Sequence, residues 1–153
     1  MSAKERHPGY LGAVLRNKCP RCREGFIYEV RNPYKLRTCL KMKERCPLCA
    51  QRTEIEVGFY YGTGYVSYGL SVMICVFSFI LWWLIIGFSL KDGRIFYWLI
   101  FNTILLIAMQ PVLMRLSRTL WLSWFVTFDP YWKERGAEPE TLDRIVPEQM
   151  GNW

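Results

Sequence analysis

Residues 19–22 read Cys-Pro-Arg-Cys, and residues 46–49 read Cys-Pro-Leu-Cys. A Cys-x-x-Cys turn lets two thiolates converge on one ion, and two such turns complete the closed tetrahedral four-sulfur shell of a structural metal site. The gap between the turns fits the longer form of the paired CxxC pattern. The sequence therefore predicts that Cys19, Cys22, Cys46 and Cys49 hold one metal ion. Zinc is the expected metal, and iron in a rubredoxin-like site is an alternative that the sequence leaves open.

Other uses of these cysteines fit the sequence less well. Disulfides need an oxidising compartment, and residues 1–18 are polar and charged, unlike a secretory signal. A thioredoxin-type motif requires one CxxC at a helix start after a strand, not two paired turns. Arg23 and Ala50 follow the two turns, where a c-type haem site requires His. We therefore expect reduced thiolates that bind a metal.

Two long apolar stretches follow the cysteines. Residues 59–90 and residues 95–114 contain no Lys, Arg, Asp or Glu. Each stretch meets the requirement of about 20 residues for a helix that crosses the hydrocarbon core of a membrane. The alternative, two buried helices of a soluble protein, would need more surrounding chain than the remaining residues supply. We predict transmembrane helices at about 65–88 and 95–114, with Pro111 kinking the second or marking its exit from the hydrocarbon.

The charge distribution predicts the orientation of these helices. Residues 91–94 (Lys-Asp-Gly-Arg) form a loop so short that the two helices must pair as an antiparallel hairpin. Thirteen Lys and Arg residues precede Phe59, and Arg115 and Arg118 follow the second span. The positive-inside rule then places both termini in the cytoplasm. We expect a multi-pass protein of the bacterial inner membrane, in which the basic block before Phe59 faces anionic lipid headgroups and not nucleic acid.

The remaining sequence predicts small units around the hairpin. Residues 1–18 form a basic leader, and residues 19–57 form a small β zinc-ribbon domain with strands at about 26–30 and 53–57. Residues 58–128 contain the hairpin and a helical extension at the membrane interface, in which Arg115 and Arg118 face phosphates. Residues 129–153 form a polar cytoplasmic tail. The fold class is a membrane protein with a cytoplasmic zinc ribbon.

The residues outside the four-cysteine set offer little reactive chemistry. His7 is the single histidine of the chain, so the sequence cannot supply a bis-His haem site or a Ser-His-Asp triad. We expect Cys39 to be a free structural cysteine, with a fifth exchangeable thiol as the alternative, and Cys75 to be an apolar filler. Asn102 and Gln110 are expected to bond to a neighbouring helix and not to a substrate. The chain is therefore not expected to be an enzyme.

Several runs of this sequence resemble one bacterial family. The runs are Lys18–Cys22, Asn32–Tyr34, Cys46–Cys49, Gly58–Gly62, Tyr65–Tyr68, and Arg115–Arg118 with Trp121 and Asp129. Together they resemble the DUF983 family, small membrane proteins with two CPxC turns and a two-helix hairpin. Arg23 and Ala50 depart from the glycine that is frequent after such turns. The family has no assigned activity, but in some bacteria its genes lie beside those for haem–copper oxidase, which implies a role in the respiratory membrane.

The sequence thus predicts a non-catalytic accessory or assembly subunit of a membrane complex. The resemblance points to a respiratory terminal oxidase or its supercomplex, with other integral membrane subunits as partners. Two alternatives remain open: a metal-delivery or redox factor, and an adaptor that recruits a soluble partner. The aromatic content of 16% exceeds what the membrane interfaces need. The candidates for interface or partner contact are Tyr60, Tyr61, Trp82, Trp83, Trp98, Arg115, Arg118, Trp121 and Trp124.

Overall fold

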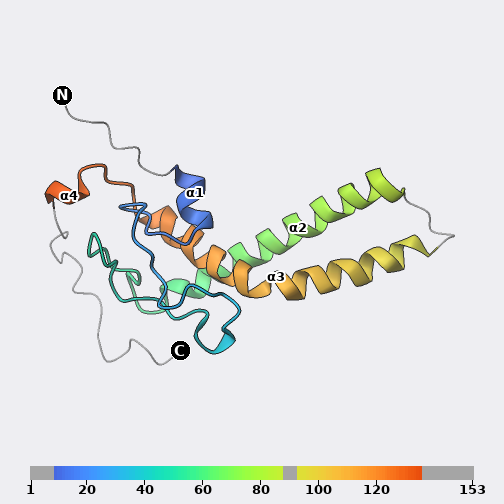
Figure 1. The fold of residues 1–153 in the computed structure, drawn as a ribbon, viewed down its shortest axis with the longest axis horizontal. Helices are drawn as coiled ribbons and strands as arrows, with labels where there is room; N and C mark the ends of the chain where they lie inside the picture. The colour runs from blue at the N-terminus through green and yellow to red at the C-terminus, as the bar shows by residue number, and fades with distance from the viewer. Residues whose placement is uncertain (1–8, 88–92, 136–153) are drawn as a thin grey trace.

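The computed structural model describes residues 9–87 and 93–135 of the chain. The described helical elements, in chain order, are α1 (Tyr10–Leu15), the 3-10 turns η1 (Leu36–Thr38) and η2 (Phe59–Gly62), α2 (Thr63–Ile86), α3 (Arg94–Phe125) and α4 (Trp132–Arg135). In Figure 1, α2 and α3 form an elongated hairpin, and the residues before α2 gather around the later part of α3. The predictions for residues 1–8, 88–92 and 136–153, including His7, Lys91 and most of the tail, lie outside the described residues.

The hairpin helices have the length and composition that the sequence predicted. Phe59–Ile86 and Arg94–Phe125 are both long and apolar enough to cross a membrane. Gly87 ends α2 at φ 77°, where its N–H bonds to the carbonyl of Trp83 at 3.0 Å, and Gly93 precedes α3 at φ 66°. Positive φ favours glycine because it lacks a Cβ. These two glycines therefore mark where the regular helices stop on either side of the connection.

Helix α3 is longer than the predicted second span. It runs without interruption from Arg94 to Phe125 and includes Pro111. Proline lacks an N–H and removes one helical hydrogen bond, yet here it does not end the helix. The turns after Pro111 are held by tertiary packing, since Leu113, Arg115 and Thr119 are buried against the amino-terminal part of the chain. The predicted extension is therefore the second half of one helix.

Residues 19–57, which we call the cysteine unit, contain no strand, so the prediction of strands at 26–30 and 53–57 is wrong. Within the described residues the pairing is limited to three isolated antiparallel bridges: Lys18 with Phe26, Tyr28 with Met42, and Arg45 with Arg52. The chain turns too often around the cysteines for a bridge to extend into a ladder. The unit is held instead by its cysteines and by packing against α3.

One core joins the cysteine unit to the carboxyl-terminal part of the described chain. Ile27 and Tyr28 of the cysteine unit are fully buried together with Leu122 of α3. The other buried members are Cys19, Cys22, Cys46, Cys49, Val126 and Trp132. Burial of an aliphatic or aromatic side chain of this kind is worth about 1.5–3 kcal/mol. The cysteine unit and the end of α3 therefore fold as a single body, and α1 adds Ala13 and Val14 to its buried residues.

Candidate metal centre

The four predicted ligands meet at one point. All four Sγ atoms lie within 4.8 Å of one another, with Cys19 and Cys49 3.6 Å apart and Cys22 and Cys46 3.8 Å apart. A tetrahedral ion with metal–sulfur bonds of about 2.3 Å requires sulfur–sulfur edges of about 3.8 Å. A disulfide requires about 2.05 Å, and the cysteines are free thiols. The donor set thus fits a metal ion and is compatible with zinc, without identifying the metal.

Backbone hydrogen bonds shape both turns in the same way. The N–H of Arg23 donates to the carbonyl of Cys19 at 2.8 Å, and the N–H of Ala50 donates to the carbonyl of Cys46 at 3.0 Å. The N–H of Gly25 donates to Cys22 Sγ at 3.3 Å. A Cβ at Gly25 would collide with Cys46 Sγ. Glycine is therefore required at residue 25 so that the backbone can approach the second pair of sulfurs.

The residue after each turn adopts a left-handed conformation. Arg23 has φ 58° and Ala50 has φ 55°. A residue with a Cβ pays about 1–2 kcal/mol in this region, whereas glycine does not. Arg23 and Ala50 stand where glycine is frequent in similar turns, and their left-handed backbone conformation explains that preference. Arg23 has an additional contact, because its guanidinium lies 3.9 Å from the ring centroid of Phe128.

The four sulfurs are buried and hydrogen-bonded to one another. The exposed fractions of Cys19, Cys22, Cys46 and Cys49 are 1%, 0%, 3% and 3%. Hydrogen bonds to Cys19, Cys46 and Cys49, of which that to Cys19 has the largest effect, lower the pKa of the Cys22 thiol. The same hydrogen bond between Cys19 and Cys22 raises the pKa of the Cys19 thiol. Hydrogen bonding to Cys19 also lowers the pKa of Cys46, to about 7. The lowered pKa values of Cys22 and Cys46 favour the thiolate, which is the form of cysteine that binds metal.

Arg115 docks the cysteine unit onto α3. Its side chain is 1% exposed and donates from Nε to the carbonyl of Cys39 at 2.7 Å. Its other two nitrogens donate to the carbonyls of Arg31 at 2.9 Å and Asn32 at 3.1 Å. The prediction that Arg115 faces lipid phosphates is wrong, because its guanidinium fork is occupied by three carbonyls of the cysteine unit. Charged hydrogen bonds of this kind are about twice as strong as neutral ones.

Further contacts continue the docking along α3. Arg118 donates to the carbonyl of Leu40 at 3.0 Å and lies 5.0 Å from the ring centroid of Tyr60, so it also faces the chain itself. Thr119, fully buried, contacts Asn17 Oδ1 at 3.1 Å. These contacts, like those of Arg115, join residues far apart in the sequence. The cysteine unit and the residues on either side of it in the chain are therefore fixed on α3 from Arg115 to Thr119.

The segment after α3 returns to the first cysteine turn. Arg21 and Asp129 form an ion pair of 3.6 Å with both side chains largely buried, and the N–H of Asp129 donates to the carbonyl of Arg21 at 3.1 Å. This double contact holds the segment after α3 against the first cysteine turn. Arg21 and Asp129 were not predicted as site residues, although both belong to the runs that carry the family resemblance.

The predicted aromatic contacts near η2 divide into buried and exposed residues. Trp121 donates from Nε1 to the carbonyl of Phe59 at 2.8 Å and is half-buried. The hydroxyl of Tyr60 donates to the carbonyl of Thr53. Tyr61 and Trp124 are exposed. Trp121 and Tyr60 thus stabilise the junction between η2 and α3, whereas the Trp124 ring packs on Trp121 with centroids 5.7 Å apart.

The hairpin is joined by aromatic and polar contacts between its helices. The ring of Trp98 lies 5.2 Å from that of Phe79, and the ring of Trp82 lies 6.0 Å from that of Phe101. Trp83 is exposed. The predicted bond of an amide to the neighbouring helix is confirmed for Asn102. The contacts of its side chain are Ser78 Oγ at 2.9 Å and Cys75 Sγ at 3.3 Å.

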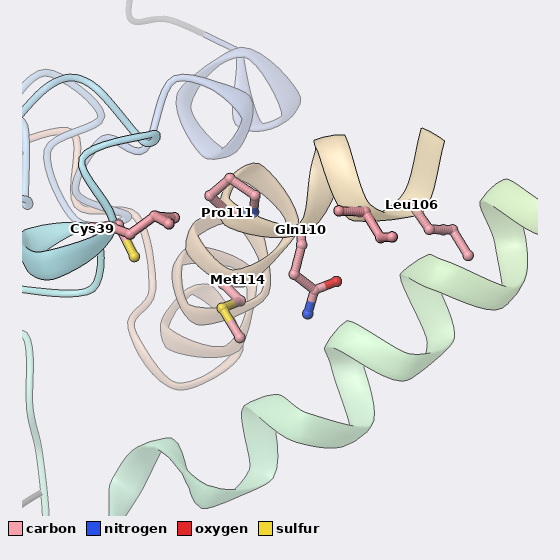
Figure 2. A pocket seen from close by; sticks show the side chains of 7 residues that line it. Cys39, Leu106, Gln110, Pro111 and Met114 are labelled. Carbon is pink, nitrogen blue, oxygen red and sulfur yellow. The ribbon is translucent and has the colours of Figure 1, made fainter. Parts of the chain in front are cut away.

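Cys39 lies apart from the four-cysteine set and borders a groove. The groove has a volume of about 460 Å³ and is formed between η1 and α3. Figure 2 shows Cys39 on the side of the cysteine unit, and Leu106, Gln110, Pro111 and Met114 on α3. Leu36 and Ile107 complete the lining. The groove was not predicted from the sequence, because its lining comes from two distant segments that meet only in the fold.

Comparisons with family models, curated proteins and solved structures gave no match to this chain.

Proposed function

We propose that this protein is a membrane-anchored structural zinc unit, in which the four cysteines stabilise a cytoplasmic platform and α2 and α3 form the anchor. The observation that supports this most directly is the docking of the buried four-sulfur cluster onto α3 through Arg115. A site that carries zinc structurally has four protein ligands and no open position. The sulfur cluster here has this composition, and its exposed fractions of 0–3% leave little access for an exchanging ligand.

The exposure of the hairpin supports membrane anchoring. In the most apolar window of Phe59–Ile86 none of the residues is buried, and in that of Arg94–Phe125 only 11% are. Large side chains such as Phe77, Leu84 and Ile107 are therefore exposed. Soluble monomers rarely expose contiguous apolar surface of this extent. The charge asymmetry around the spans supports a bacterial inner-membrane orientation with both termini in the cytoplasm.

We infer a non-catalytic, accessory role, because the uncharged spans and the buried cysteine cluster fit a structural role better than a catalytic one. Residues 59–90 and 95–114 contain no Lys, Arg, Asp, Glu or His, so the spans lack the side chains that ordinarily carry protons or ions across a membrane. A rigidly docked metal site also fits a structural platform better than a delivery factor, which must release its ion. Two helices cannot cover each other fully, and the remaining faces fit other integral membrane subunits. Only the resemblance to DUF983 suggests a respiratory terminal oxidase as the partner complex.

Purification through a carboxyl-terminal tag from native membranes in mild detergent tests this role. We expect integral membrane subunits to co-purify and zinc to resist exchange with a chromogenic chelator over hours. Cys22→Ser should lose the metal, whereas Cys39→Ser, which changes a buried cysteine outside the cluster, should keep it. Rapid release of metal to the chelator would support a delivery factor instead. Co-purification of soluble proteins alone would support an adaptor, and either result would overturn the structural-subunit proposal.

A further inference from the structure

The groove beside α3 combines an apolar lining with a basic border. Of its seven lining residues, Gln110 carries the only polar side chain apart from the Cys39 thiol. Leu36 lines the groove although it is 72% exposed, and it stands between the exposed residues Lys35 and Arg37. An apolar cavity with few polar groups is the usual form of a small-molecule site. The basic residues next to Leu36, Lys35 and Arg37, indicate which class of small molecule this groove could bind.

The charges around η1 are of one sign. Residues 30–43 contain Arg31, Lys35, Arg37, Lys41 and Lys43 and no Asp or Glu. Lys41 is already paired with Glu29 at 3.2 Å. Lys35 and Arg37 are exposed and precede and follow the lining residue Leu36 in the chain. A ligand whose apolar part enters the groove can therefore bring its polar end within reach of two cations. Complementarity of charge therefore requires an anionic head on that ligand.

The position of the groove along α3 matches that of a lipid at the membrane surface. Leu106, Ile107 and Met114 belong to the uncharged stretch 95–114, and the charged part of the helix begins at Arg115. An acyl chain beside the uncharged stretch would therefore remain at hydrocarbon depth. Lysine and arginine at the end of such a stretch reach the level of the headgroups.

We propose that the groove binds one anionic phospholipid, with an acyl chain against Ile107 and Met114 and its phosphate beside Lys35 and Arg37. The Gln110 amide lies between these regions of the lipid and can donate to an ester carbonyl. This inference rests on the membrane placement in the proposed function. Its consequence is that a lipid completes the junction between the cysteine unit and the hairpin.

Native mass spectrometry of the full chain in mild detergent tests the proposal. The protein is incubated with equal amounts of phosphatidylglycerol and phosphatidylcholine that carry the same acyl chains. We expect one retained phosphatidylglycerol per chain and at least about fivefold less phosphatidylcholine, since a basic residue near an anionic headgroup favours binding by about this factor. Arg37→Gln should lower the preference about fivefold. Lys41→Gln, a matched loss of charge at a residue paired with Glu29, should change it by less than about twofold.

A second pair of variants tests the apolar part. Ile104 and Ile107 are exposed isoleucines on α3, at 63% and 69%, but only Ile107 lines the groove. Ile107→Trp should fill the groove and lower retention of both lipids about tenfold, the effect of losing about two methylene contacts. Ile104→Trp should leave retention unchanged. Metal content measured in the same samples reports whether each variant is folded.

The failure of this inference is distinguishable from failure of the proposed function. Equal retention of the two lipids by the wild-type chain, or full retention by Ile107→Trp, would overturn the lipid site while leaving the metal and co-purification results intact. A wild-type dimer whose formation Ile107→Trp abolishes would also overturn it, because the groove would then hold a second copy. A chain that stays soluble and monodisperse without detergent would contradict the membrane placement itself.

Discussion

Arg115 and Tyr28 make two direct contacts at the junction between α3 and the cysteine unit. The Arg115 guanidinium lies 4.8 Å from the centroid of the Tyr28 ring, and the Tyr28 hydroxyl donates to the Arg115 carbonyl at 2.8 Å. Both side chains are buried, and burial raises the pKa of Tyr28 to about 12. The hydroxyl is therefore protonated and remains a donor at physiological pH. Through this pair α3 and the cysteine unit form one structure.

Substitution Arg115→Lys should destabilise the junction by about 2–4 kcal/mol. Lysine keeps the charge but lacks the planar fork that bonds to three carbonyls, so buried acceptors lose their donors. Chemical unfolding of the full chain in detergent, followed by tryptophan fluorescence, measures the change. Arg16→Lys, at an exposed position just after α1, is the control and should have no measurable effect. Equal midpoints for the two variants would contradict the docking role of Arg115.

Gly25→Ala should weaken metal binding. A Cβ at residue 25 would strike Cys46 Sγ, so either the sulfur or the backbone must move away from the cluster. Competition with a chelator of known affinity measures the loss. Gly12→Ala is the matched control, because a Cβ there meets nothing within 4 Å and the residue lies inside α1. That change should leave metal affinity unaltered and stabilise the helix by about 0.5–1 kcal/mol. Unchanged affinity in Gly25→Ala would refute the close approach.

Ala50→Gly should stabilise the second cysteine turn. Ala50 has φ 55°, where its Cβ is sterically unfavourable, and glycine removes that cost. Glycine also increases the conformational entropy of the unfolded chain, which offsets about 0.4–1 kcal/mol of the gain in stability. We expect a net gain of up to about 1 kcal/mol in unfolding free energy. Ala50→Val places a β-branched residue in the same conformation and should lose more than about 1 kcal/mol. If both variants shifted stability in the same direction, the left-handed strain would not be the cause.

Asn102→Ala should loosen the hairpin. The change removes the Asn102 contacts with Ser78 and Cys75 of α2, and polar contacts between membrane helices are worth about 0.6 kcal/mol on average. Thr103→Ala is the control, since the Thr103 hydroxyl donates to Leu99 of its own helix at 2.8 Å. Unfolding in mixed micelles should separate the two variants. A larger loss for Thr103→Ala would argue against Asn102 as the interhelical contact.

Local patterns in the sequence predicted the parts of this protein but not how they join. The CxxC spacing predicted that four sulfurs would meet, and uncharged runs predicted two long apolar helices, because both signals lie in neighbouring residues. Arg115 was misplaced at the lipid surface because an arginine after an apolar span ordinarily faces phosphates. Its true acceptors, the carbonyls of residues 31, 32 and 39, lie more than 70 positions away. No local pattern records such contacts.

The errors in secondary structure have a similar origin. Residues 26–30 have β-forming side chains, but the turns imposed by the cysteines leave only isolated bridges at Phe26 and Tyr28. Pro111 lies inside α3, which continues to Phe125 as the predicted helical extension. At residues 26–30, contacts distant in sequence outweighed local preference.

The metal content of the full chain, purified from native membranes without added metal, tests the central claim most directly. Inductively coupled plasma mass spectrometry should find one zinc ion per chain in the wild type and none in Cys22→Ser. In that variant residues 19–57 should also lose their protection from limited proteolysis, because metal binding and folding are coupled in small sites. Cys75→Ser, outside the cluster, should keep both. A full chain that contains neither zinc nor iron, or a Cys22→Ser variant with full metal content, would contradict the account.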